Sequence, residues 1–151
     1  MEFSVHSNCL EDTLKLASKL AIHLNRKDII LLQGDLGAGK TAFAKGIGLG
    51  LNIKDTVISP TFNILKCYFK GKVPLYHIDA YRLEKHNKDI GLEEYIEGNG
   101  IAMVEWPDHI KELLNVQHLE IKIINKGNSV RELTFMTPNK YYEKIIRRIL
   151  K

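Results

Sequence analysis

The most constraining feature of this chain is residues 34–41, whose sequence Gly-Asp-Leu-Gly-Ala-Gly-Lys-Thr matches the phosphate-loop pattern G-x-x-x-x-G-K-[ST]. Residues 29–32, just before it, form an unbroken apolar run, as expected of a strand that is buried on both faces. The residues after it, up to Leu51, contain no proline and have apolar side chains at helical spacing. A strand, a glycine-rich loop and a helix in this order predict a binding site for a nucleoside triphosphate.

The residue types within this loop have separate tasks in binding phosphates. The glycines let successive backbone N–H groups turn inward around phosphate oxygens. The Lys40 ammonium is expected to reach the β- and γ-phosphates, and the Thr41 hydroxyl is expected to bind Mg²⁺. The N-terminus of the following helix adds the positive end of its dipole. We therefore expect the bound group to be a triphosphate with its magnesium ion.

Two acidic residues directly follow apolar strands later in the sequence. Asp79 comes after the strand expected over residues 73–78, and Glu105 comes after the strand expected over residues 101–104. Because ligands of parallel sheets bind beyond the carboxyl ends of the strands, both acids and the phosphate loop should converge on one edge. Phosphoryl transfer needs an oxygen ligand for Mg²⁺ and a group that positions the attacking water. A helix cap or a solvated loop residue is the alternative interpretation for each acid.

The remaining sequence alternates between helical and strand patterns. A helix with an apolar stripe that begins at Leu10 is expected over residues 10–24, a β-hairpin over residues 119–135, and a terminal helix after Pro138. The chain has 151 residues, of which 44% are hydrophobic, and the sequence contains no internal repeat or linker. We expect a single domain over residues 1–151 with an α/β fold of the P-loop NTPase type. This fold is a three-layer sandwich with a mainly parallel central sheet and antiparallel strands at its margins.

Charge and the start of the chain bear on where the protein works. The formal net charge is +4, and some of the excess lies in residues 140–151. A solvated helix face explains this basic end more simply than a contact with tRNA or an acidic partner. The first residues lack a signal-peptide pattern, and no apolar run reaches membrane-spanning length. We therefore expect a cytoplasmic protein that does not enter a membrane.

A resemblance to a known family covers nearly the whole chain. It rests on the phosphate loop, Ser-Pro-Thr-Phe at 59–62, Tyr-His-Ile-Asp-Ala-Tyr-Arg-Leu at 76–83 and Glu-Trp-Pro at 105–107, in this order. This set resembles the successive motifs of the TsaE family, also called YjeE, which supplies the ATPase component of bacterial tRNA threonylcarbamoyladenosine synthesis. The resemblance implies a Mg²⁺-dependent ATPase, slow on its own, that binds the TsaB–TsaD pair and resets it between rounds of tRNA modification. Contact with tRNA itself would be indirect or weak.

The same resemblance implies roles for individual residues. It implies that Asp79 and Lys40 act in hydrolysis and that Thr41 and Glu105 bind Mg²⁺. The residues expected to contact ATP are Leu10, Leu36, Gly37, Ala38, Gly39, Lys40, Thr41, Asp79 and Arg131.

The sequence leaves two interpretations open for each of three further residues. Thr61 is either a turn residue or a hydroxyl that senses the γ-phosphate. His77 is either a packed residue at the end of a strand or a part of the site. Trp106, the single tryptophan, belongs either to the core or to the surroundings of the nucleotide or partner.

Three other functions compete with a regulatory ATPase. A small-molecule kinase would need an acceptor pocket and an arginine-bearing lid, which residues 79–100 with Arg82 alone would have to supply. A GTPase switch is suggested by Asn-Lys-Gly-Asn at 125–128, but the fourth residue lacks the carboxylate that would bind guanine, and a hairpin turn also favours Asn and Gly. The third alternative is a nucleotide-dependent binding module that does not hydrolyse its ligand.

Overall fold

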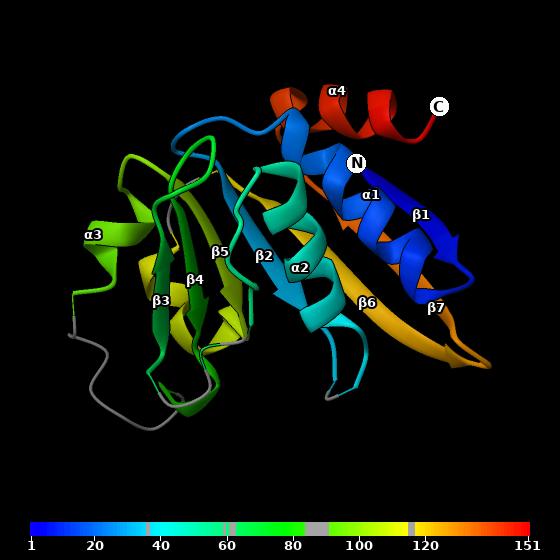
Figure 1. Ribbon diagram of the computed structural model, residues 1–151, viewed down its shortest axis with the longest axis horizontal. Coiled ribbons are helices and arrows are strands. Elements are labelled where there is room, and N and C mark those ends of the chain that lie inside the picture. The colour runs from blue at the N-terminus through cyan, green and yellow to red at the C-terminus, as the bar shows by residue number, and fades with distance from the viewer. Residues whose placement is uncertain (36, 59, 61–62, 84–90, 115–116) are drawn as a thin grey trace.

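The structure is a computed structural model that describes residues 1–35, 37–58, 60, 63–83, 91–114 and 117–151 (Figure 1). Its strands are β1 (Glu2–Ser7), β2 (Ile29–Gln33), β3 (Leu65–Tyr68), β4 (Leu75–Asp79), β5 (Ile101–Glu105), β6 (Leu119–Gly127) and β7 (Val130–Met136). Its α-helices are α1 (Leu10–Ile22), α2 (Lys40–Gly50), α3 (Glu93–Ile96) and α4 (Lys140–Ile149). Two 3₁₀ segments, η1 (Tyr81–Leu83) and η2 (Pro107–Leu113), follow β4 and β5.

The strands form one sheet in the order β1-β7-β6-β2-β5-β4-β3. The four inner strands, β6, β2, β5 and β4, pair in parallel. The pairs β1–β7, β6–β7 and β3–β4 are antiparallel. Strands β2 and β5 lie in the middle of the sheet and are buried on both faces, as their continuous apolar sequences require. The expected parallel centre with antiparallel margins is confirmed.

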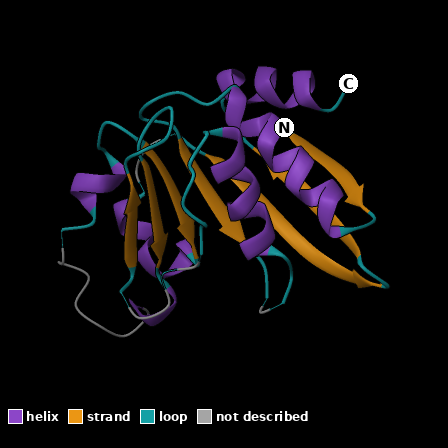
Figure 2. Cartoon of the chain, in the orientation of Figure 1, coloured by secondary structure: helices purple, strands orange, loops and turns teal. Residues whose placement is uncertain are grey.

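Helical segments cover both faces of the sheet and complete the expected three layers (Figure 2). Residues of α1, α2 and α4 form the core on one face, and residues of η1, α3 and η2 form a thinner layer on the other. Along β5, Ile101 and Met103 belong to the first core, whereas Ala102 and Val104 belong to the second. Because side chains alternate along a strand, Glu105 continues the series that faces α2. The sheet therefore turns this strand-end acid toward the helix that follows the phosphate loop.

The sequence pattern correctly predicts the buried side of α4 but not the exposure of Leu10 in α1. The basic end of the chain is the exposed side of α4, whose opposite side is buried through Tyr142, Ile145, Ile146 and Ile149. The sequence pattern predicts that Leu10 begins the apolar stripe of α1, but 62% of it is exposed. This prediction is wrong for Leu10: it is the first residue of α1 and lines a hollow together with Gly39 and Ala42, outside the packed core. Among the described residues, no helix is both long enough and apolar enough to cross a bilayer.

Candidate functional site

The phosphate loop connects β2 to α2, and two of its glycines are required by the geometry. A Cβ atom on Gly34 would lie 2.7 Å from the carbonyl oxygen of Ile123 on β6, so no side chain fits there. Gly39 precedes the first residue of α2 with a φ of 113°, in the left-handed region that strains residues with a side chain. Leu36, an expected ATP contact, lies outside the described residues. Gly37 and Ala38 lie in the same loop, where Ala38 is buried.

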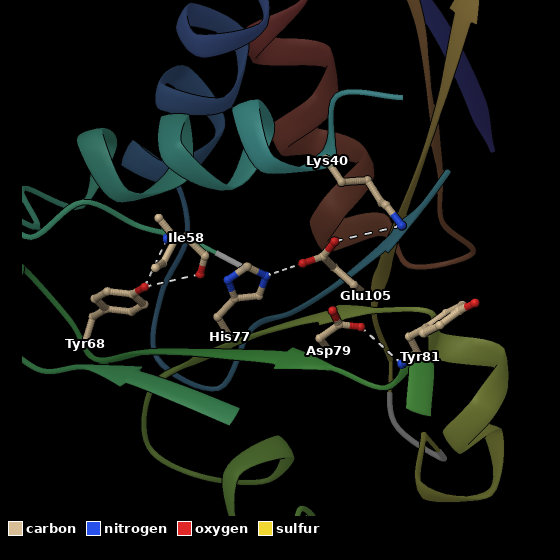
Figure 3. A network of polar contacts seen from close by, with 7 residues as sticks. All are labelled: Lys40, Ile58, Tyr68, His77, Asp79, Tyr81 and Glu105. Carbon is tan, nitrogen blue, oxygen red and sulfur yellow. Dashed lines mark hydrogen bonds and ion pairs between the residues drawn. The ribbon is translucent and has the colours of Figure 1, made fainter. Parts of the chain in front are cut away.

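Lys40 begins α2 and points across the carboxyl edge of the sheet (Figure 3). Its side chain is 8% exposed, and its Nζ atom lies 3.9 Å from Oε1 of Glu105. The same atom lies 4.3 Å from the centre of the Trp106 ring, a distance typical of a cation–π contact. Burial lowers the pKa of Lys40, while the charges of Glu105, Asp79 and Asp35 oppose this shift. The loop therefore presents a cation that is already surrounded by negative and aromatic groups.

The two strand-end acids lie side by side next to this cation. Asp79 is the last residue of β4, Glu105 is the last residue of β5, and the two are direct partners in the parallel register. Asp79 accepts a hydrogen bond of 3.1 Å from the backbone N–H of Tyr81. The pKa of Asp79 is raised, mainly by burial and to a smaller extent by the negative charge of Glu105. The hydrogen bond from Tyr81 and the positive charge of Lys40 oppose this rise. The structure thus brings Lys40, Asp79 and Glu105 together at one edge, whereas their roles stay predictions.

His77 belongs to this cluster rather than to the apolar core alone. Its side chain is fully buried on β4, and its Nε2 atom lies 2.6 Å from Oε2 of Glu105. Both oxygens of the Glu105 carboxylate therefore have a basic partner, Lys40 at one and His77 at the other. The sequence left the two interpretations of His77 equally open. Its place two residues before Asp79, and therefore on the same face of the strand, is the signal that could have separated them.

Trp106 forms the rim of the site. It follows Glu105 with a left-handed backbone, φ 56° and ψ 52°, and its indole covers the Lys40 ammonium. The ring stacks against His109, with centroids 5.7 Å apart, and contacts Tyr81 at 5.0 Å. Trp106 is half-buried, so it lies between the core and the surface at the loop.

Hollows flank the phosphate loop on two sides. One has a volume of about 330 Å³ and lies between the loop, the start of η2 and the end of β6; Asp35, Trp106 and Lys122 are among its lining residues. Another has a volume of about 150 Å³ and lies beside the first turn of α1; its lining residues are Cys9, Leu10, Thr13, Gly39, Ala42, Ser129 and Arg131. Leu10 and Arg131, far apart in the sequence, therefore meet next to Gly39. Asp79 and Glu105 are not among the lining residues of either hollow.

The donors available for a divalent cation are oxygen atoms. Thr41 is exposed in the first turn of α2, next to Lys40, and the Glu105 carboxylate lies against Lys40 from the sheet. Hydroxyl and carboxylate oxygens suit Mg²⁺, which usually keeps water and substrate phosphates as its other ligands. The described residues contain no group of three or more His, Cys, Asp or Glu placed to hold a metal ion by themselves. The residues present thus fit an ion that is shared with bound phosphates. Thr61 lies outside the described residues.

Comparisons with known proteins agree with this architecture. A family model described as "Threonylcarbamoyl adenosine biosynthesis protein TsaE" matches residues 7–133. A tRNA threonylcarbamoyladenosine biosynthesis protein TsaE of Bacillus subtilis (strain 168) is 45% identical over 133 residues, which are 88% of this chain and 84% of that protein. A protein of the same name from Treponema pallidum (strain Nichols) is 35% identical over 85% of this chain and 96% of its own length.

A solved structure leads to the same conclusion about the fold. The crystal structure of YdiB from B. subtilis superimposes with a TM-score of 0.87 and 36% sequence identity, over 99% of this chain and 94% of that one. The family match spans the phosphate loop, both strand-end acids and Arg131. The chain belongs to the TsaE family.

Proposed function

We propose that this chain binds ATP with Mg²⁺ at the carboxyl edge of its sheet and hydrolyses it. The supporting observation is the meeting of Lys40 with Asp79 and Glu105 beside a complete phosphate loop. We further propose that this ATPase serves tRNA threonylcarbamoyladenosine biosynthesis, the process that the names of its relatives state. In this role it acts on the TsaB–TsaD pair, so that its nucleotide cycle resets that complex.

The chemistry follows from the charges that surround the loop. Lys40 and the backbone N–H groups of the loop bind the phosphates, while Leu10 and Arg131 contact the rest of the nucleotide from the second hollow. Thr41 and Glu105 hold Mg²⁺, which neutralises charge on the phosphates when it is bound. Asp79 orients the water that attacks the γ-phosphorus while the bond to the β-γ bridging oxygen breaks. Because burial raises the pKa of Asp79, it accepts a proton more readily than an exposed aspartate does.

The activity of the isolated chain is expected to be slow. In this structure Lys40 contacts Glu105 and Trp106, so we expect its ammonium to rearrange when phosphates bind. Enzymes that depend on such a rearrangement often wait for a partner to complete the site. We expect phosphate release to accelerate when the TsaB–TsaD pair is added.

The hydrolytic role is tested by phosphate release from wild type and Asp79→Asn, with Asp28→Asn as the matched control at the other end of the sheet. We expect Asp79→Asn to bind ATP with nearly unchanged affinity and to release phosphate at least about 100-fold more slowly. Wild-type turnover in Asp79→Asn would exclude this role for Asp79. In cells, deletion of the gene should deplete the tRNA modification, and Asp79→Asn should fail to restore it.

The competing functions make different predictions in the same assays. A small-molecule kinase would transfer phosphate to an acceptor, whereas water is the sole acceptor in our proposal. A GTPase would prefer GTP; Asn125, however, accepts hydrogen bonds from the Gly127 N–H and from Arg131 at the turn of the β6–β7 hairpin. These contacts favour a turn over a guanine site. A binding module without hydrolysis would release no phosphate even with partners present.

A further inference from the structure

His77 is a polar residue on the face of β4 that packs under the helices. Alternate residues of a strand share a face, so His77 points the same way as Leu75 and Asp79. Leu75 belongs to the core beneath α1 and α2, and Met103, the partner of His77 in register on β5, is fully buried in the same core. His77 therefore lies one step inward from the acids, between the apolar core and the edge of the sheet.

The bond between His77 and Glu105 fixes the orientation of the carboxylate. The distance from Nε2 to Oε2 is 2.6 Å, and the two side chains are 0% and 4% exposed. Because a carboxylate oxygen accepts, the Nε2–H group donates. The other oxygen, Oε1, is then turned toward Lys40, 3.9 Å from its ammonium (Figure 3). Without His77, the carboxylate would lose a buried contact that restrains its rotation.

Packing alone does not explain an imidazole at this position. The Nδ1 atom of His77 is buried and has no hydrogen-bond partner among the described residues. A buried polar atom without a partner lowers stability, because it has lost its contacts with water. An apolar side chain would fill the same space without this loss. The Nε2–H donor to Glu105 is the feature of histidine that such a replacement would remove.

We infer that His77 is a positioning residue, which holds the Glu105 carboxylate so that Oε1 faces the phosphate loop and its magnesium ion. The inference rests on the proposed function, because it requires Glu105 to be a Mg²⁺ ligand. Carboxylates that bind metals are commonly fixed by such outer hydrogen bonds, and the loss of one typically weakens metal binding or activity about 10- to 100-fold. His77 acts on the ion through Glu105 and does not itself touch the nucleotide.

Two variants with amide side chains test whether the N–H donor, rather than the rest of the imidazole ring, is what His77 contributes. The amide nitrogen of His77→Gln reaches about as far as Nε2, whereas the amide nitrogen of His77→Asn is one bond shorter and does not reach Glu105. Calorimetry with a non-hydrolysable ATP analogue, in Mg²⁺ and in EDTA, gives the ratio of the two affinities, here called the magnesium effect. We expect His77→Asn to reduce the magnesium effect about tenfold and His77→Gln to keep it within about threefold. The affinity in EDTA should change in neither variant.

Controls distinguish positioning from packing. Met103→Leu alters the packing next to His77 but keeps both the His77 donor and the Glu105 carboxylate, and it should keep the full magnesium effect. If His77→Asn does not fold, His77→Leu fills the space without a donor and supplies the same comparison. A wild-type magnesium effect in the variant without a donor would overturn the inference, as would an equal loss in His77→Gln.

A different set of results would show that the proposed function, and not only the role of His77, is wrong. If the wild-type protein shows no magnesium effect, or if Glu105→Gln retains it, then Glu105 is not the Mg²⁺ ligand and both proposals fail. If Glu105→Gln loses the effect while His77→Asn keeps it, the magnesium site stands and the inference about His77 alone is wrong.

Discussion

Buried carboxylates occur at both ends of the parallel strands, and their partners differ. At the amino end, Asp28 directly precedes β2 and is 7% exposed. It accepts hydrogen bonds from the Asn25 N–H at 2.7 Å, from the Tyr141 hydroxyl at 2.9 Å and from the Tyr142 hydroxyl at 3.3 Å. These donors are neutral, and two of them belong to α4, which lies at the opposite end of the sheet from the phosphate loop (Figure 1). Asp28 thus ties the last helix to the sheet.

At the carboxyl end, the partners of Glu105 are basic side chains next to the phosphate loop. Lys40 lies against one oxygen and His77 against the other, while Asp79 adds a second carboxylate. At the amino end, neutral donors satisfy the Asp28 carboxylate. At the carboxyl end, a basic side chain lies next to two acids, and these charged groups can bind a charged ligand. The comparison teaches that burial of an acid does not by itself mark a functional site. The type of partner, and the position beside the phosphate loop, separate the two ends.

The largest effect on ATP affinity is expected for Lys40→Ala, which removes the cation at the carboxyl end. A hydrogen bond to a charged group contributes about 1.5–3 kcal/mol, so the affinity for ATP should fall about 10- to 100-fold. Calorimetry with ATP and Mg²⁺ measures this change. Lys45→Ala, which alters an exposed lysine of the same helix, is the control. If Lys40→Ala bound ATP as tightly as Lys45→Ala does, the claim that the carboxyl end of the sheet is the ATP site would be contradicted.

Glu105→Gln sharpens the comparison by removing one carboxylate charge and keeping the shape. We expect the part of the ATP affinity that depends on Mg²⁺ to fall about tenfold, because an amide oxygen is a weaker ligand for the ion. The affinity in EDTA should not fall. Titrations of Mg²⁺ at fixed ATP test this, with the exposed Glu97→Gln as control. An unchanged requirement for Mg²⁺ would contradict the assignment of Glu105.

Asp28→Ala tests the amino end. Loss of the carboxylate leaves the Asn25 N–H and the tyrosine hydroxyls without their acceptor, which should lower the free energy of unfolding by about 1–3 kcal/mol. Urea unfolding measures the loss, and ATP affinity should stay the same. A parallel drop in ATP affinity would break the division between a structural end and a functional end.

The smallest effect is the change in stability expected for Asp79→Asn. Burial raises the folded-state pKa of Asp79 above 3.8, so the folded protein binds this proton more tightly than the unfolded chain. The charged form therefore lowers stability above the raised pKa, and this cost disappears as the pH falls to about 3.8 and below. Asp79→Asn should gain up to about 1 kcal/mol at pH 7, since solvent screens a half-buried charge.

Unfolding of wild type and Asp79→Asn at neutral pH and near pH 3.5 checks this sign. The gain should be present at neutral pH and absent in acid. A loss of stability at neutral pH would mean that Asp79 is held by favourable contacts, as a structural acid is.

Sequence patterns predicted the carboxyl end far better than the amino end. The phosphate loop is contiguous, and parallel strands bring their carboxyl ends together, so the positions of Asp79 and Glu105 follow from strand patterns alone. The link between Asp28 and the tyrosines of α4 joins residues more than a hundred positions apart through the final packing of a helix. No local pattern encodes such a contact.

Other features that sequence patterns predicted wrongly or left open have identifiable physical causes. Leu10 is the first residue of α1 and lies beside a hollow, and helical periodicity does not show which end of an apolar stripe extends beyond the core. The position of Trp106 depends on a left-handed backbone, which is uncommon for a residue with a large side chain. The contact between His77 and Glu105 requires the exact pairing of β4 with β5, since a shift of one residue would turn His77 to the other face.

Calorimetry of the wild-type protein with a non-hydrolysable ATP analogue, in Mg²⁺ and in EDTA, tests the central claim most directly. If the phosphate loop and the strand-end acids form one site, the analogue binds at a single site and binds more tightly with Mg²⁺. Absence of binding in both buffers, or equal affinity in both, would contradict the claim that Lys40, Asp79 and Glu105 together hold a triphosphate and its ion.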